Sequence, residues 1–383
     1  MRIGVIGTGV AGSLLLESLR DKPGFELMGF ERVVEGARED AGTGLNICPN
    51  ALKALRLYLP ARHEALRAAS LPWRRWFADT ATGERLLDLD LLDVAEEPGV
   101  RLRWSELYRL MRAPVADCTQ YGHELVALEQ DAAGRLVPVF SRAGTLVRHG
   151  GFDLLVAADG RYSKLRALAD AEPVPEHHGL AMTRLLVPAA EDCPYDDYGQ
   201  WFNGNNRLLS YRLPGGAVYI AGAFPISGDI APEQKTAAHA RAMYLPAEAA
   251  PCAAVAWMVE KTCAMIEQLH WARLQVTPLQ RGAANGQVLF LGDSAHAMVP
   301  TLGQGATQAI EDGVLAAAVL AKGGDVAAVA ALRDARVSFV RQLSLAATDS
   351  MWPGADAVAL TRLKGQPAFL AQLRQLYTDV PLI

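Results

Sequence analysis

The chain has 383 residues, and its composition and charge exclude several classes of function. Its 51% hydrophobic and 21% charged residues are ordinary for a globular protein of two or three domains. The formal net charge is -5, and no basic face with interleaved aromatic residues is visible, so nucleic acid is not an expected partner. No apolar run approaches the roughly 20 residues of a membrane span, and no signal-peptide pattern is present. We therefore expect a cytoplasmic protein that is not held in a membrane.

The five cysteines are scattered, odd in number and without a C-x-x-C pair. They predict neither a metal site nor a disulfide framework. Their positions are Cys48, Cys118, Cys193, Cys252 and Cys263.

The first predicted elements are a strand over 2–6 and a helix after it, joined by glycines in G-x-G-x-x-G spacing. Gly7 would make the tight turn, Gly9 would let the backbone approach a pyrophosphate, and Gly12 would let helix and strand pack closely. A second strand over 25–30 ends at Glu31, near the distance at which an acid binds the ribose of a dinucleotide. The pattern predicts a dinucleotide site but does not separate NAD from FAD.

Two later segments also end an apolar strand in polar residues. Residues 152–166 break at Asp159 and Gly160, and residues 286–312 run from a strand through Asp293 to a glycine-flanked helix from about 306 to 320. Each alone is typical of an ordinary turn or loop. Strand ends that lead into helix N-termini are where open α/β sheets hold ligands, so the segments together favour a cofactor site.

In this order the motifs resemble the group A flavoprotein monooxygenases, the single-component aromatic hydroxylases built like 4-hydroxybenzoate hydroxylase. The resemblance rests on the glycine motif followed by Glu31 and Arg32 and on four quoted stretches. These are AADGRYSKLR, LGDSAHAMVP, GQGATQAIEDG and the softer match GTGLNICPNALKALRLY. It implies an α/β fold with a Rossmann-like FAD-binding domain, an inserted β-sheet substrate domain and a C-terminal helical segment.

The resemblance also divides the chain into domains. The expected FAD-binding domain is discontinuous, over 1–70, 96–174 and 275–325. The expected substrate-binding domain covers 71–95 and 175–274. The remaining residues, 326–383, should form helices that pack on the FAD domain; a dimer contact is the less favoured alternative, and a monomer or homodimer is expected.

Residue by residue, the resemblance implies how FAD is held. Asp293 would bond the ribityl hydroxyls, and Asp159 would lie along the phosphates and the nicotinamide approach. The helix that begins near Ala306 and Thr307, after Gly303 and Gly305, would point its N-terminus at the flavin edge that becomes negative on reduction.

Other expected FAD contacts are weaker matches. Val126 would meet adenine, and Arg32 or Arg38 would lie near the phosphates. Trp104 stands where the family often has an arginine or glutamine in contact with flavin. Arg101, Arg103 or Arg109 could take over this contact, and Trp104 could equally be core packing at the start of a helix.

The implied reaction is hydroxylation of an aromatic compound. NAD(P)H docks transiently and reduces FAD, O₂ adds to give the flavin C4a-hydroperoxide, and one oxygen passes to a phenolic or hydroxylated N-heteroaromatic substrate. The carbonyl of Pro300 would face the C4a locus. His296 could relay a proton, although we favour the interpretation that it only orients the loop.

The segment between the second and third motifs alternates as strands do and then turns helical over 232–246 and 250–268. We expect a sheet, joined by a hairpin from 74–91, that roofs a cavity over the flavin. Tyr211 and Arg184 are the favoured catalytic candidates in it, and each has a plain alternative as a sheet residue. The full set of cavity candidates is Trp201, Phe202, Tyr211, Tyr219, Arg184 and Asn46.

Other functions remain open at this stage. They are a reductase or oxidase of the same fold and a flavin-binding sensor that does not turn over. Halogenation is disfavoured because SLPWRRWFAD lacks the W-x-W-x-I-P signature.

Overall fold

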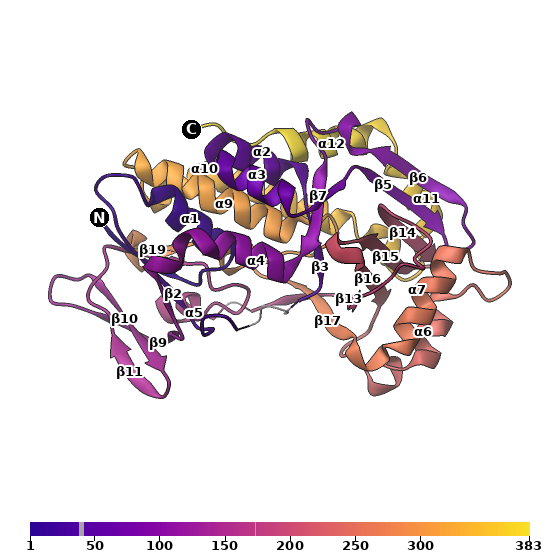
Figure 1. Cartoon of the computed structure of the whole chain (residues 1–383), viewed down its shortest axis with the longest axis horizontal. Helices are drawn as coiled ribbons and strands as arrows, with labels where there is room; N and C mark the ends of the chain where they lie inside the picture. Colours follow the sequence, from indigo (N-terminus) through magenta and orange to yellow (C-terminus); the bar gives the residue numbers. More distant parts are fainter. Residues whose placement is uncertain (38–41, 173) are drawn as a thin grey trace.

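The computed structural model describes residues 1–37, 42–172 and 174–383. Figure 1 shows two sheet regions at opposite ends of an elongated molecule, connected by the long helices α9 (Gln304–Ala321) and α10 (Val326–Ala346). The α/β class predicted from the sequence is confirmed. The exact domain boundaries stay a prediction.

One region is a six-stranded sheet whose strands are parallel except for the short β18 at one edge. Its order is β18 (Gly282–Ala283), β19 (Val288–Phe290), β12 (Leu154–Ala157), β1 (Arg2–Ile6), β2 (Glu26–Glu31) and β8 (Thr119–Tyr121). A separate antiparallel sheet of three strands extends beside it, made of β9 (Glu124–Gln130), β10 (Leu136–Arg142) and β11 (Thr145–Arg148).

The second region is a seven-stranded sheet, which we call the substrate sheet. Its order is β17 (His270–Val276), β13 (Glu176–Val187), β16 (Val218–Pro225), β15 (Asn206–Arg212), β14 (Tyr198–Asn203), β5 (Arg75–Thr80) and β6 (Arg85–Asp90). The predicted hairpin is therefore present as β5 and β6, at the sheet edge. A separate small sheet has the order β3 (Gly44–Ile47), β7 (Gly99–Arg103) and β4 (Leu71–Trp73). In Figure 1, β3 and β7 lie near the middle of the molecule, between the two regions.

The two faces of the substrate sheet pack against different partners. On the inner face, Tyr198, Phe202 and Tyr211 share a buried cluster with Leu302 and with Leu343 of α10. On the outer face, Trp201 packs with residues of α6 (Ala237–Tyr244) and α7 (Ala253–Ala264). Because neighbouring residues of a strand point to opposite faces, Trp201 and Phe202 cannot both line the same cavity, and the prediction was wrong for Trp201.

The remaining helices surround these sheets. They are α1 (Val10–Leu19), α2 (Pro49–Tyr58), α3 (Pro60–Ala68), α4 (Trp104–Arg112), α5 (Lys164–Ala169), α8 (Asp293–His296), α11 (Ala357–Leu363) and α12 (Pro367–Thr378). The C-terminal segment contacts both regions, because α12 packs on α2 and α11 packs on β6 of the substrate sheet. The expectation that it packs on the FAD domain was thus incomplete. Among the described residues, none of the helices combines the length and apolar character that a bilayer crossing requires.

Candidate active site

The carboxyl ends of β1, β2, β12 and β19 meet at one edge of the six-stranded sheet because these strands are parallel. A cleft of about 660 Å³ opens at this edge. Six of the predicted cofactor residues line it, namely Gly7, Gly9, Glu31, Arg32, Val126 and Asp159. The other predicted cofactor residues lie outside this lining.

The three glycines each meet a different steric demand. A Cβ on Gly12 would lie 2.1 Å from the carbonyl oxygen of Gly7, and a Cβ on Gly7 would lie 2.5 Å from the carbonyl oxygen of Ala158. At Gly9 the nearest atom to a Cβ would be 3.8 Å away, on Tyr108. Gly9 also caps α1 without any side-chain hydrogen bond to the helix. The first turn of α1 therefore offers free backbone N–H groups to an anion in the cleft.

Glu31 ends β2 with its carboxylate held in place and only 6% of the residue exposed. It accepts hydrogen bonds from the backbone N–H of Thr8 at 3.2 Å and of Val33 at 3.1 Å. Arg112 donates to it at 3.0 Å. The structure thus fixes a single acid, with a defined orientation, beside the glycine turn.

The arginine that reaches this acid was not among the candidates from the sequence. Arg101 is buried and donates to the carbonyls of Pro72 and Asp196, and Arg109 pairs with Glu106 of its own helix. Arg112 lines the cleft together with Trp104 and Tyr108, whose ring centroids are 5.4 Å apart. The helical spacing of Trp104, Tyr108 and Arg112 was the signal that could have found them. Arg38 lies outside the described residues.

Asp159 follows β12 and caps the next helix. One of its oxygens accepts from the backbone N–H of Lys164 at 2.8 Å and of Leu165 at 3.2 Å, while the other has no partner. Burial raises the pKa of this carboxyl above its ordinary value, against the hydrogen bonds that lower it. Asp159 therefore has a structural role at the start of the next helix, and its second oxygen is buried without a partner in the described part of the chain.

Asp293 follows the end of β19, at a turn that lies close to the starts of α1 and α9. A Cβ on Gly292 would lie 3.2 Å from Ala309 of α9 and 3.7 Å from Ala11 of α1. A Cβ on Gly305 would lie 3.9 Å from a carboxylate oxygen of Asp293. The acid and the open start of α9 therefore face the same space.

The helix α9 begins at Gln304, two residues before the predicted start, because Gly303 adopts a φ of 67° and caps it. No side chain caps this N-terminus, and Ala306 lies half-buried in its first turn. The hydroxyl of Thr307 accepts from the backbone N–H of Cys48 at 3.1 Å and donates to the carbonyl of Gly303 at 3.0 Å. The carbonyl of Pro300 accepts from the backbone N–H of Gly303 at 3.0 Å. These bonds define the loop that leads into the helix.

His296 lies in a different environment from the other site residues predicted from the sequence. It is fully buried, and its Nε2 lies 2.6 Å from a carboxylate oxygen of Asp312. The same oxygen accepts from Arg281 at 3.0 Å and from the backbone N–H of Gly292 at 2.8 Å. The histidine therefore belongs to a buried ionic network beneath the Asp293 turn.

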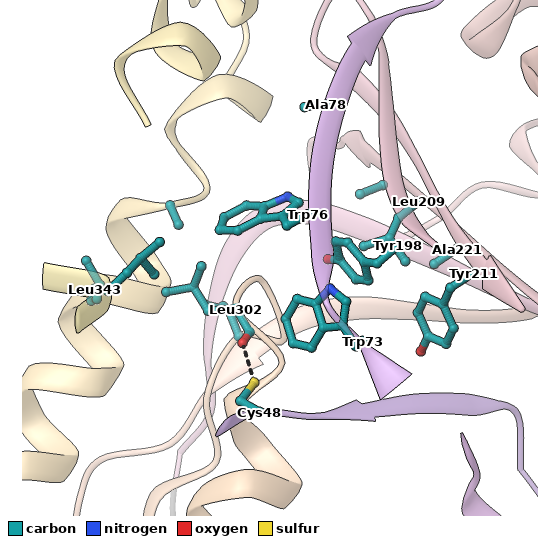
Figure 2. Close-up of a cluster of buried hydrophobic side chains, with 14 of the residues drawn as sticks. Cys48, Trp73, Trp76, Ala78, Tyr198, Leu209, Tyr211, Ala221, Leu302 and Leu343 are labelled. Atoms are coloured by element: carbon teal, nitrogen blue, oxygen red, sulfur yellow. Dashed lines mark hydrogen bonds between the residues drawn. The ribbon is translucent and has the colours of Figure 1, made fainter. Parts of the chain in front are cut away.

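The two favoured substrate-side residues lie near one another on the inner face of the substrate sheet. The ring of Tyr211 stacks on Tyr198 at 5.6 Å and lies 5.0 Å from the ring of Tyr219. Burial raises the pKa of Tyr219 above its ordinary value, and the charge of Arg184 opposes the shift. Figure 2 shows the rings of Tyr198 and Tyr211 on the sheet side, with Leu302 between the sheet and the helix that carries Leu343.

Asn46, another predicted cavity residue, lies at the same junction. Its side chain is close enough to Gly303 that a Cβ there would be 2.3 Å from Nδ2. The side chain of Asn46, on β3, is therefore packed directly against Gly303, which caps α9.

Comparison with known proteins decides the family. The family described as FAD binding domain matches residues 107–338. A 3-amino-4-hydroxybenzoate 2-monooxygenase of Streptomyces platensis is 30% identical over 81% of this chain and 77% of its own length. The chain belongs to the FAD-dependent aromatic hydroxylases.

Other members of these hydroxylases are similar over most of their length. A FAD-dependent urate hydroxylase of Klebsiella pneumoniae is 27% identical over 91% of this chain and 88% of its own. A 6-hydroxynicotinate 3-monooxygenase of Pseudomonas fluorescens is 26% identical over 84% and 83%. The crystal structure of Klebsiella pneumoniae HpxO with FAD and uric acid superimposes with a TM-score of 0.81 at 22% identity, covering 100% of this chain and 98% of that one.

The residues present fit the FAD that these hydroxylases use. The glycine turn, the uncapped start of α1 and the fixed carboxylate of Glu31 suit the adenosine and pyrophosphate. Asp293 and the uncapped start of α9 suit the ribityl chain and the electron-rich edge of the flavin. This hydroxylase is thus a FAD-dependent monooxygenase, and the individual cofactor contacts stay predictions.

Proposed function

We propose that the enzyme hydroxylates a small phenolic compound or hydroxylated N-heteroaromatic, with NAD(P)H as reductant and O₂ as co-substrate. The observation that carries this proposal is the buried tyrosine face of the substrate sheet opposite the loop before α9. Stacked aromatic side chains suit a flat aromatic ring. The names of the relatives agree, since urate, 6-hydroxynicotinate and 3-amino-4-hydroxybenzoate are all flat rings that carry ring oxygens or hydroxyls.

Bound FAD would carry the reducing equivalents of NAD(P)H to O₂ and supply the oxygen chemistry. The protein residues would orient and enclose the reactants. The start of α9 would favour negative charge on the reduced cofactor, and the Pro300 loop would lie beside it. The inner sheet face would exclude water, which otherwise releases hydrogen peroxide in place of product. Tyr211 and Arg184 would orient the substrate.

The test is the rate of NADH and NADPH oxidation by the FAD-loaded protein in air, with and without phenols, hydroxypyridines and hydroxyquinolines. We expect one class to accelerate oxidation and to gain one oxygen atom from ¹⁸O₂, seen by mass spectrometry. Tight FAD binding with no acceleration by any compound would instead favour the sensor. Acceleration without oxygen in the product would favour a reductase or oxidase.

The location and assembly of the enzyme are separate proposals. We infer a cytoplasmic monomer or homodimer, which is consistent with the net charge of -5 and with the absence of long apolar runs in the sequence. Light scattering coupled to size exclusion measures the assembly, and cell fractionation measures the location.

A further inference from the structure

Two residues of the sequence motifs have no role in the site described so far. Gln304 is the middle residue of the Gly-Gln-Gly stretch and the first residue of α9. Asn50 follows Pro49, the first residue of α2. Both residues are fully buried, and a buried amide is unfavourable unless it is hydrogen-bonded. The partners of the two amides therefore indicate what they hold in place.

The two amides bond to each other across the junction of α2 and α9. Asn50 Nδ2 donates to Gln304 Oε1 at 3.1 Å, and Gln304 Nε2 donates to Asn50 Oδ1 at 3.4 Å. Because each amide both donates and accepts, the two side chains fix each other's orientation. We call these two residues the amide pair.

A buried network anchors the amide pair. Gln308 Nε2 donates to Gln304 Oε1 at 3.0 Å, and Asn50 Nδ2 also donates to Glu311 at 2.6 Å. Arg333 of α10 donates to Gln308 at 2.7 Å and to Glu311 at 2.6 Å. The first residue of α9 is therefore connected through side chains to both α2 and α10.

The network holds a helix start that lacks a capping side chain. A side chain at the cap position commonly fixes an N-terminus, whereas Gly303 caps α9 without any such bond. The first backbone N–H groups of α9 have no partner within the helix, so another contact must set their direction. Gln304 provides it by turning its side chain back into the protein. Apolar side chains of similar volume could fill this space, so the amides contribute orientation more than packing.

We propose that the amide pair positions the first turn of α9 against the flavin and thereby favours the reduced, anionic cofactor over the oxidised one. Asn50 and Gln304 are positioning residues, because they act through the backbone of α9 and not by contact with FAD. The proposal rests on the proposed function, in which the start of α9 lies at the flavin edge that becomes negative on reduction. Donors stabilise a charge only when they are aimed at it, and the effect of the helix dipole falls off beyond the first turn. A small rotation of this turn should therefore weaken binding of reduced FAD more than binding of oxidised FAD.

The experiment compares the reduced and oxidised cofactor on the FAD-loaded full chain. It measures the two-electron reduction potential of bound FAD by equilibration with a redox dye without oxygen, the Kd of oxidised FAD, and the melting temperature. The variants are Gln304→Met, Asn50→Leu and the double variant, whose side chains have similar size and no amide. The control is Leu315→Ala, because Leu315 is fully buried in the core farther along α9 and contributes packing alone.

We expect Gln304→Met to weaken binding of reduced relative to oxidised FAD about tenfold, which lowers the reduction potential by about 30 mV. Asn50→Leu should shift the potential in the same direction, and the double variant should shift it no further, since both single variants break the same pair. The Kd of oxidised FAD should change less than about threefold, because the adenosine and pyrophosphate are held at α1.

The variants should remain folded. In Gln304→Met, Asn50 and Gln308 each keep a hydrogen bond to Glu311. Leu315→Ala should lower the melting temperature at least as much as Gln304→Met, because it leaves a cavity, and should leave the potential unchanged. Gln304→Asn is the milder variant, since its amide is one methylene shorter, and it should lower the potential by a smaller amount.

Three results would overturn the proposal. They are an unchanged potential in Gln304→Met or Gln304→Asn at a lowered melting temperature, an equal shift in Leu315→Ala, and additive shifts in the double variant. Because the potentials are measured without substrate or O₂, failure of the hydroxylation test would leave the amide pair standing. Conversely, turnover with unchanged potentials in both single variants would remove the positioning role and leave the hydroxylase.

Discussion

The two ends of the candidate site differ in whether their buried polar groups have partners within the protein. At the cofactor edge, Glu31 has backbone and arginine partners, and the cleft beside it is open at about 660 Å³. On the substrate sheet, Arg207 is buried beside a cavity of about 10 Å³ and lacks a counter-ion. The cofactor end is therefore assembled before its ligand arrives, whereas the substrate end leaves donors unsatisfied that a ligand would complete.

A second buried charge cluster sharpens this contrast. Glu311 and Asp312 of α9 are fully buried and pair with Arg333 of α10 at 2.6 and 2.9 Å. Arg336 and Arg281 complete their coordination at 2.7 and 3.0 Å. Here every charge has an opposite partner, so the cluster holds α9 and α10 together without a ligand. This cluster therefore differs from Arg207, which has no carboxylate partner among the described residues.

The cofactor end should be the most sensitive to a single added methyl group. Gly12→Ala puts a Cβ 2.1 Å from the carbonyl of Gly7, so helix and strand must separate. We expect a loss of about 1–3 kcal/mol or more in the free energy of unfolding and loss of bound FAD. Urea denaturation and flavin absorbance after purification measure the two effects.

Gly9→Ala is the matched comparison, because its Cβ would have no neighbour nearer than 3.8 Å. The fold should keep near wild-type stability while FAD affinity falls about tenfold or more, since the methyl group stands where the pyrophosphate approaches. Equal FAD affinity in Gly9→Ala and the wild type would mean that the cofactor does not lie against this turn.

The paired cluster predicts a specific pH dependence of stability. Burial alone would raise the pKa of Glu311, but Arg336 and Arg333 outweigh it and lower the value from 4.5 to about 2. A depressed carboxyl pKa stabilises the fold above the unfolded value and loses that contribution as pH falls from about 4.5 toward 2. Glu311→Gln should therefore cost about 3–5 kcal/mol at pH 7 and flatten the decline below pH 4.5.

Urea unfolding between pH 3 and 7 measures this difference. Glu129→Gln serves as the control, because Glu129 pairs with Arg148 on the exposed three-stranded sheet, and its pair is screened by salt. Parallel pH profiles for the wild type and Glu311→Gln would show that the cluster does not stabilise the fold through its charges.

The sequence predicted the cofactor end because its chemistry is carried by backbone. Only glycine meets the contacts at Gly7 and Gly12, so the requirement appears as letters at fixed spacing. The position of Glu31, at the end of β2, is predicted by the same βαβ geometry. Asp293 and the glycines before α9 were predicted for the same reason, since each stands at a strand end or a helix start.

The substrate end was predicted only in part because its residues come from distant segments. Alternation along strands drew attention to Tyr211 and Arg184, but Trp201 falls on the other face. Arg207 is four residues before Tyr211, so the strand period alone places both on one face, a signal that was present in the sequence. Lys364, which lines the same small cavity as Arg207, had no such signal, because nothing local indicates that α11 packs on the substrate sheet.

The smallest effect on catalysis is expected at His296, a residue that the motif alone places near the flavin. The structure buries it completely against Asp312, within the paired cluster, and its Nδ1 has no partner. His296→Gln should reduce the free energy of unfolding by about 1–3 kcal/mol, because a buried hydrogen bond is weakened. The kcat of the hydroxylation should stay within about twofold, with the shape of its pH profile unchanged. A relay would give the opposite pair of results, a large fall in kcat with loss of one limb of the profile at unchanged stability. Measuring both quantities on the same variant therefore decides whether this histidine belongs with the paired charges or with the site that the substrate completes.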